Sequence, residues 1–333
     1  MKAGYKSIDR LLTQNEKTLI RLYKESLKNI KSDIASLYEK MGNDISVPSS
    51  MKYNRLLNME KSIQAELIGL ASKSKTVISD GIKSAFNETY NITGWATETS
   101  LGVDLGFAGL DRKVANKVLG GSVNFKVFDT KGEKIISSID LDPFDLINWE
   151  TSTNKVVQGF NTKIKEELTK GLIKGDSYAT MGKNIGKVGG KNAWQMQRIL
   201  RTEGGRASSQ GYLTAYDDVS QSAQRLNVEM SNKWLSTLDA NTRDTHQSLD
   251  QQIAVAEEGG TPLFKSNGAT APAPRMFGIA KEDINCRCAT TPVVEGLEDT
   301  KFRKARDASG KSVLVKNQTY KQWSDAKKIR TNL

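Results

Sequence analysis

The sequence is poor in several residues that compact enzymes and secreted scaffolds rely on. Its 333 residues include one histidine, two cysteines and six prolines, and aromatic residues make up only 7%. Cys286 and Cys288 are one residue apart and cannot easily form a disulfide with each other, which excludes a secreted disulfide scaffold. The first ten residues lack the apolar core of a signal peptide, and no run approaches the roughly 18 apolar residues of a membrane span. We therefore expect a protein that is made in a cytoplasm and has no membrane span.

Acidic residues are also scarce relative to basic ones, and the net charge is +11. The segment 301–333 holds ten basic residues against two aspartates, so it carries most of this excess. Long basic side chains contact phosphates without reading base sequence. A milder excess, nine basic against three acidic residues between 155 and 198, is interpreted as a solvated face. We predict non-specific binding of double-stranded DNA through Lys301, Arg303, Lys304, Arg306, Lys311, Lys316, Lys321, Lys327, Lys328 and Arg330.

The spacing of apolar residues predicts a chain of two or three domains that begins with helices. Residues 1–90 favour a helical hairpin or bundle, with helices ending near Met41, Ser72 and Tyr90. The other expected segments are a glycine-rich stretch with a β-hairpin (91–145), a helical stretch broken at Gly189-Gly190 (146–220), a mixed α+β module (221–300) and a basic tail (301–333). We therefore expect an α+β protein with an elongated, mainly helical N-terminal half and a small mixed C-terminal domain that ends in a basic tail.

The only histidine and both cysteines lie in the C-terminal module, 221–300. His246 follows Arg243 by three residues and precedes Asp250 by four, so the three share a face of a short helix, which Asp239 or Asn241 can cap. Cys286 and Cys288 point to one side if they lie in a strand. One interpretation is a zinc site with ligands His246, Cys286, Cys288 and either Asp250, Asp239 or a water molecule. The other is a pair of small buried cysteines beside a hydrogen-bonded histidine. No other cofactor is expected.

A second cluster of charged residues lies on the helix before the module. Arg201, Glu203 and Arg206 are close in sequence, and Glu203 and Arg206 have the spacing of a pair within a helix. We interpret them as a buried brace that holds the module, in preference to a catalytic group.

The chain carries the motif residues Arg201-Thr202-Glu203, Tyr212, Trp234, Asp239, Thr242-Arg243, His246, Leu249-Asp250 and Asn285-Cys286-Arg287-Cys288. This pattern resembles the phage Mu F-like, or head-morphogenesis, minor head proteins of tailed bacteriophages. The resemblance covers about residues 190–325. The family commonly has glycine after Leu-Asp, where this chain has Gln251, which puts the conformation of that turn in doubt. The residues that carry the structural motif are Arg201, Glu203, Arg206, Trp234, Asp239, Thr242, Arg243, Asn285 and Arg287.

The resemblance implies a low-copy virion protein, made in the host cytoplasm and located inside the head at the portal vertex. Its implied partners are the portal protein, packaged DNA and scaffold or other head proteins. It implies assistance in head morphogenesis and DNA delivery, with some members entering the host with the DNA, and no catalytic turnover.

Three alternatives stay open. A zinc- or cysteine-dependent nuclease can use His246 with a cysteine nucleophile. An ADP-ribosyltransferase-like enzyme can use Arg201 and Ser236-Thr237, but the Glu-x-Glu that should follow is missing, since Glu257-Glu258 has the wrong spacing. The third is a pure assembly factor without DNA contact.

Overall fold

The computed structural model divides the chain into two compact units, each described here by itself. The helical unit comprises residues 12–81 and 144–200, and the mixed unit comprises residues 1–11, 82–143 and 201–333. The predicted α+β class is confirmed, with a mainly helical N-terminal half followed by small antiparallel strand pairs. The residues that the structure describes are 4–41, 49–103, 105, 107, 109–110, 123–128, 134–139, 144–174, 176–256, 260–294, 302–306 and 312–316.

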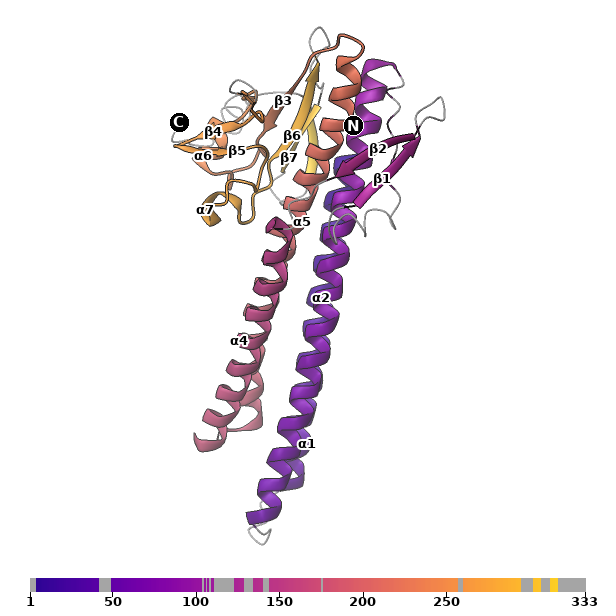
Figure 1. Ribbon diagram of the computed structural model, residues 1–333. Helices are drawn as coiled ribbons and strands as arrows, with labels where there is room; N and C mark the ends of the chain where they lie inside the picture. Colours follow the sequence, from indigo (N-terminus) through magenta and orange to yellow (C-terminus); the bar gives the residue numbers. More distant parts are fainter. Residues whose placement is uncertain are drawn as a thin grey trace. The chain divides into compact units, whose positions relative to one another are not determined.

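Four long helices supply the helical unit. They are α1 (Gly4–Met41), α2 (Ser49–Leu101), α4 (Phe144–Lys174) and α5 (Tyr178–Gln224) (Figure 1). Side chains at helical spacing on each of them are buried, and these include Tyr23 on α1 and Phe160 on α4, whose ring centroids lie 5.7 Å apart. The hydroxyl of Tyr23 donates to Oδ1 of Asn192 on α5 at 2.7 Å. Within the described ranges, no helix is long and apolar enough to cross a membrane.

Helix α2 runs through the break that the sequence predicted near Ser72, so that prediction is wrong. The apolar stripe continues from Leu70 to Ile78, but its middle position is Ser74, which is completely buried. A small polar residue on the buried face made the stripe look interrupted. The helix also extends beyond Tyr90 through buried threonines, of which Thr97 donates its hydroxyl to the carbonyl four residues earlier at 2.9 Å.

Helix α5 likewise runs through Gly189-Gly190, where the sequence predicted a separation. The side chain of Leu27 on α1 occupies the space that a Cβ at Gly189 would need, so glycine allows a close helix contact there. Gly190 has open space around it. A side chain caps the start of α5, because Oγ of Ser177 accepts a hydrogen bond from the backbone N–H of Thr180 at 3.3 Å.

In the mixed unit, the end of α2 packs closely against the C-terminal part of α5. A Cβ at Gly211 would overlap the backbone carbonyl of Phe86, so only glycine fits at this crossing. Next to it, the hydroxyl of Tyr90 donates to Asp218 at 2.6 Å, and the hydroxyls of Thr89 and Ser208 lie 2.7 Å apart.

The strands of the mixed unit form four antiparallel pairs (Figure 1). The predicted hairpin pairs β1 with β2, and the C-terminal module pairs β3 with β6 and β4 with β5. The last pair, β7 with β8, lies in the segment that the sequence treated as a tail, so that segment contains a hairpin. Two short helices, α6 and α7, complete the module. The bounds are β1 Val123–Phe128, β2 Lys134–Ile139, β3 Met230–Leu235, α6 Asp244–Ser248, β4 Phe264–Ser266, β5 Ala269–Ala271, α7 Ala280–Asp283, β6 Ala289–Val294, β7 Phe302–Arg306 and β8 Ser312–Lys316.

Only some of the predicted DNA-binding residues lie in this hairpin. Arg303, Lys304 and Arg306 belong to β7, and Lys316, which ends β8, is exposed. The remaining ones lie outside the described residues: Lys301, Lys311, Lys321, Lys327, Lys328 and Arg330.

Candidate functional site

One face of α5 holds the C-terminal module through polar contacts at helical spacing. Oγ1 of Thr202 accepts the N–H of Asn285 at 3.2 Å, and the hydroxyl of Ser209 donates to the carbonyl of Pro274 at 2.7 Å. One turn further, the hydroxyl of Tyr212 donates to Oδ1 of Asn232 on β3 at 2.5 Å. These contacts place three separate segments of the module against one helix.

The expected pair of Glu203 and Arg206 forms on the same face. Nη1 of Arg206 lies 2.6 Å from Oε2 of Glu203, and Nε donates to the carbonyl of Arg275 at 3.0 Å. Nη2 approaches Asp283 on α7 at 3.8 Å. Arg206 therefore braces α5 against the module, as the sequence predicted. Arg201, the third member of the motif, is exposed.

Arg275 connects this face to the cysteines, and no pattern in the sequence indicated this role. Its Nη1 donates to the carbonyl of Gly205 at 3.0 Å, while Nε and Nη2 donate to the carbonyls of Cys286 and Cys288 at 2.8 and 3.2 Å. Arg275 has φ +70°, which few non-glycine residues adopt, so the backbone is bent to aim this side chain. Because Arg275 lies in a loop, no periodicity of the sequence could have indicated its role.

The segment 285–288 turns both cysteines inward, although it is not the strand that the sequence predicted, because β6 begins only at Ala289. Asn285 has φ +56°, a conformation that asparagine tolerates better than most residues. Arg287 points the other way and forms an ion pair with Asp239, with Nη2 2.9 Å from Oδ1. Its carbonyl accepts the hydroxyl of Thr237 at 2.6 Å.

His246 lies on α6, whose start also differs from the prediction. Neither Asp239 nor Asn241 caps this helix: the N-cap is Arg243, whose guanidinium donates to the carbonyl of Ile284. Asp239 instead accepts the N–H of Asn241 at 2.9 Å and the hydroxyl of Thr242 at 3.1 Å, which shapes the turn before α6.

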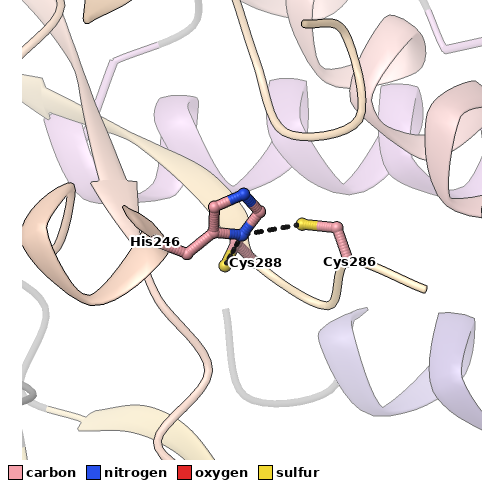
Figure 2. A group of neighbouring side chains, drawn as sticks. All are labelled: His246, Cys286 and Cys288. Atoms are coloured by element: carbon pink, nitrogen blue, oxygen red, sulfur yellow. Dashed lines mark hydrogen bonds between the residues drawn. The ribbon is translucent and has the colours of Figure 1, made fainter. Parts of the chain in front are cut away.

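The imidazole of His246 meets both cysteines. Nδ1 lies 3.5 Å from Sγ of Cys286 and 3.5 Å from Sγ of Cys288, and Figure 2 shows both contacts converging on this one nitrogen. The ring packs edge-on against Trp234, with centroids 5.5 Å apart, and stacks with Phe277 at 6.1 Å. The three residues therefore converge, which the sequence permitted but could not show.

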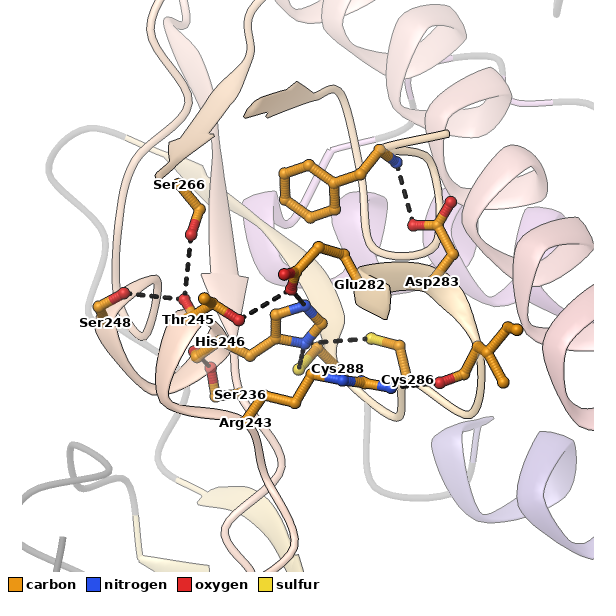
Figure 3. Close-up of polar contacts among 12 residues, drawn as sticks. Ser236, Arg243, Thr245, His246, Ser248, Ser266, Glu282, Asp283, Cys286 and Cys288 are labelled. Carbon is orange, nitrogen blue, oxygen red and sulfur yellow. Dashed lines mark hydrogen bonds and ion pairs between the residues drawn. The ribbon is translucent and has the colours of Figure 1, made fainter. Parts of the chain in front are cut away.

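The other nitrogen of the ring faces a carboxylate that the sequence did not single out. Nε2 of His246 lies 3.1 Å from Oε2 of Glu282, although it makes no well-aligned hydrogen bond among the described residues. The same oxygen accepts the hydroxyl of Thr245 at 2.8 Å (Figure 3). Glu282 lies in the four-residue helix α7, next to Asp283, which accepts the N–H groups of Phe277 and Gly278. The only sequence signal was an acidic pair shortly before Asn285.

Neither aspartate considered as a metal ligand joins the cluster. Oδ1 of Asp250 accepts the N–H of Ser236 at 2.9 Å, and Asp239 is paired with Arg287. Within the described residues, the group whose potential ligand atoms come together consists of His246, Cys286 and Cys288.

Burial and neighbouring groups shift the pKa values of the two thiols in opposite directions. Burial alone raises the pKa of Cys286, but hydrogen bonds with Cys288 and His246 and the positive charge of Arg275 together bring that pKa well below its ordinary value. Burial raises the pKa of Cys288, and the neighbouring Cys286 raises it further. The environment therefore stabilises a thiolate at Cys286.

Comparison with known proteins finds a family whose members resemble the part of the chain that holds this site. Residues 162–291 match the family described as phage Mu protein F like protein, a range that includes most of α5, His246 and both cysteines. The chain is also 25% identical over 332 residues to the minor head protein GP7 of Bacillus phage SPP1, covering 97% of this chain and 96% of that protein. The resemblance to the phage Mu F-like minor head proteins is therefore confirmed.

A second relative carries the name of an enzyme. The chain is 28% identical over 334 residues to the NAD(+)--arginine ADP-ribosyltransferase EFV of Enterococcus faecalis (strain ATCC 700802 / V583). The match covers 99% of this chain but only 59% of that relative. No solved structure matches the chain.

The residue that departs from the Mu F-like pattern adopts the conformation that glycine would have there. Gln251 has φ +68°, and its N–H donates to the carbonyl of Trp234 at 2.9 Å. The turn therefore keeps its left-handed backbone despite the side chain, which answers the doubt that this substitution raised.

Ser236 and Thr237, which were considered for other chemistry, make structural contacts. The hydroxyl of Ser236 donates to the carbonyl of His246, and that of Thr237 to the carbonyl of Arg287. Glu257 and Glu258 lie outside the described residues. Cys286 and Cys288 are 4% and 3% exposed, so a substrate could not reach either sulfur without rearrangement of the module.

Proposed function

We propose that this chain is a minor head protein of a tailed bacteriophage, which associates with the portal vertex inside the head and assists head morphogenesis. The observation that carries the proposal is the match to the SPP1 minor head protein, which spans nearly the whole of both chains. A match over nearly the full length of both chains supports a common role for them. The portal protein and other head proteins, including scaffold, are the partners that this role requires.

The proposal includes non-specific contact with packaged double-stranded DNA through the basic segment 301–333. This segment combines the highest positive charge of the chain with an exposed lysine at the end of β8. Release of counterions drives such binding, which makes it independent of base sequence and strongly dependent on salt. Delivery into the host with the DNA is part of the same proposal, because a protein bound to the genome at the portal is placed to leave with it.

We propose no catalytic turnover for the chain. Much of the enterococcal ADP-ribosyltransferase is unmatched by this chain, so its named activity does not transfer through the matched part alone. The buried histidine–cysteine cluster and the occupied hydroxyls of Ser236 and Thr237 support a structural role for the module.

Two binding measurements test the proposal. The chain, co-expressed with the portal protein encoded by the same genome, should co-purify with portal rings through size-exclusion chromatography. Its affinity for duplex DNA, measured by fluorescence anisotropy at several salt concentrations, should fall linearly on a log–log plot, by about 0.9 per phosphate contact. Deletion of residues 301–333 should flatten that slope and leave portal binding unchanged.

A control variant tests whether DNA binding depends on segment 301–333 or on positive charge elsewhere in the chain. Lys163→Gln with Lys170→Gln removes two positive charges from α4, outside the proposed DNA-binding segment, and should leave the slope as in the full chain. Portal binding without any salt-dependent DNA binding would support the pure assembly factor instead. DNA binding without portal binding would remove the minor head assignment.

A further inference from the structure

The three potential ligand atoms of the cluster already stand at the spacing of a metal site. Nδ1 of His246 and the two Sγ atoms all lie within 4.8 Å of one another, and each sulfur is 3.5 Å from the nitrogen. Zinc bonds of about 2.3 Å to sulfur and about 2.0–2.1 Å to nitrogen put these atoms about 3.6 Å apart when the geometry is tetrahedral. The two observed nitrogen–sulfur distances match this geometry.

Hydrogen bonds alone do not account for this arrangement. If Nε2 carries the ring proton, Nδ1 has a single lone pair, so it can accept a hydrogen bond from only one of the two thiols. Both sulfurs nevertheless sit at the same distance from it. A central cation explains this symmetry, because each of the three atoms directs one lone pair toward a shared point.

The surroundings hold the three ligands as a second coordination shell does. A histidine that binds a metal usually presents its other ring nitrogen to a carboxylate. Here Oε2 of Glu282 lies 3.1 Å from Nε2 and is itself fixed by the hydroxyl of Thr245. Arg275 holds the carbonyls of both cysteines, so their backbone positions are fixed independently of the side chains.

We propose that His246, Cys286 and Cys288 bind one zinc ion that closes the C-terminal module. Two thiolates balance the charge of Zn²⁺, which suits a site where His246 is only 1% exposed. Two sulfurs and an imidazole are soft and intermediate ligands and favour zinc over magnesium or calcium. Among the described residues the group supplies three ligands, so the fourth position is left for a water molecule or for a residue outside the described ranges.

The role of this zinc is structural. It connects α6 to a segment forty residues later in the chain, across a loop that contains β4, β5 and α7. The hydrophobic cluster beneath it, which includes Trp234, Leu249 and Phe264, is small. A metal that binds only the folded arrangement adds its binding free energy to folding, so the module should depend on it.

Elemental mass spectrometry of the full chain, purified under reducing conditions without chelator, gives the first test. We expect one zinc per chain in the wild type and none in the Cys286→Ser/Cys288→Ser variant or in His246→Ala. The control is Leu249→Ala, which weakens the same cluster without removing a ligand and should keep its zinc. A metal-free wild type that is folded and takes up no zinc on titration would overturn the proposal, as would copper or iron in place of zinc.

A second measurement does not depend on the folding of the ligand variants. Chain stripped of metal and reloaded with Co²⁺ should show the intense visible bands of a tetrahedral site and a thiolate-to-cobalt charge-transfer band in the near ultraviolet. Glu282→Gln keeps all three ligands and should bind zinc about 10–100-fold more weakly, because the carboxylate no longer orients the ring. Octahedral cobalt bands without charge transfer, or unchanged zinc affinity in Glu282→Gln, would contradict the proposed site.

Discussion

The buried brace of α5 allows a quantitative test through Arg206→Met. Methionine keeps much of the length of arginine but removes the guanidinium, which contacts Glu203, Asp283 and the carbonyl of Arg275. The side chains of Arg206, Glu203 and Asp283 are only 15%, 11% and 3% exposed. Removing one partner of a buried ion pair typically costs about 3–5 kcal/mol, because the remaining charge stays in a poorly solvated site. We therefore expect Arg206→Met to lower the free energy of unfolding by about this amount.

Two companion variants isolate the electrostatic cause. Adding Glu203→Gln to Arg206→Met removes one of the carboxylates that lost its partner, so the double variant should be more stable than Arg206→Met alone. Lys165→Met breaks the exposed pair with Glu60, whose side chains are 41% and 47% exposed, and should cost less than about 1 kcal/mol.

Urea unfolding followed by tryptophan fluorescence measures these differences. In a background where the other tryptophans are replaced by phenylalanine, the buried Trp234 reports on the C-terminal module, which contains the brace, and far-UV circular dichroism reports on the helices, which carry Lys165. If Arg206→Met and Lys165→Met shift the unfolding transition by similar small amounts, the brace contributes no more than a surface pair. The structural interpretation of Arg206 would then be wrong.

Three further predictions use the same unfolding assay, with far-UV circular dichroism for the helices. Gln251→Gly should raise the free energy of unfolding by up to about 1 kcal/mol, because glycine adopts φ +68° without strain, whereas the neighbouring control Gln252→Gly should not stabilise. Gly190→Ala should stabilise by about 1 kcal/mol, and Gly211→Ala, where the new Cβ meets backbone, should destabilise by about 1–3 kcal/mol; equal effects would contradict the described helix contacts. Burial raises the pKa of Asp218 in the folded protein, so this carboxyl lowers the stability of the wild type as pH rises from about 4 toward neutrality. The stability of Asp218→Asn relative to wild type should therefore increase over that range. A stability difference that stays constant with pH would refute the raised pKa.

The sequence predicted the helices wherever apolar residues carried the pattern and failed where small or polar residues took their place. Ser74 is buried on the stripe of α2, and Thr97, beyond Tyr90, satisfies its hydroxyl on the helix itself. Gly189 looked like a helix break, but it is a site of close packing against Leu27. Both errors have the same cause. Local composition does not show which residue size a contact with a neighbouring helix requires.

Some residues of the candidate site could be identified from the sequence, and others could not. His246, Cys286 and Cys288 could be singled out because their residue types are so rare in this chain. Glu203 and Arg206 could be paired because helical spacing brings them together. Arg275 and Glu282 could not be identified, since one lies in a loop and the other in a helix of four residues, where no periodicity applies. Their positions depend on tertiary contacts with α5 and α6.

The solitary histidine also gives this chain a built-in spectroscopic reporter. Selective labelling of histidine yields one set of imidazole resonances, all from His246. Because the ring stacks with Phe277 and meets the edge of Trp234, aromatic ring currents will displace those resonances from their random-coil positions. The signal can therefore follow the state of one module inside an assembly as large as a phage head, with no probe attached to the chain.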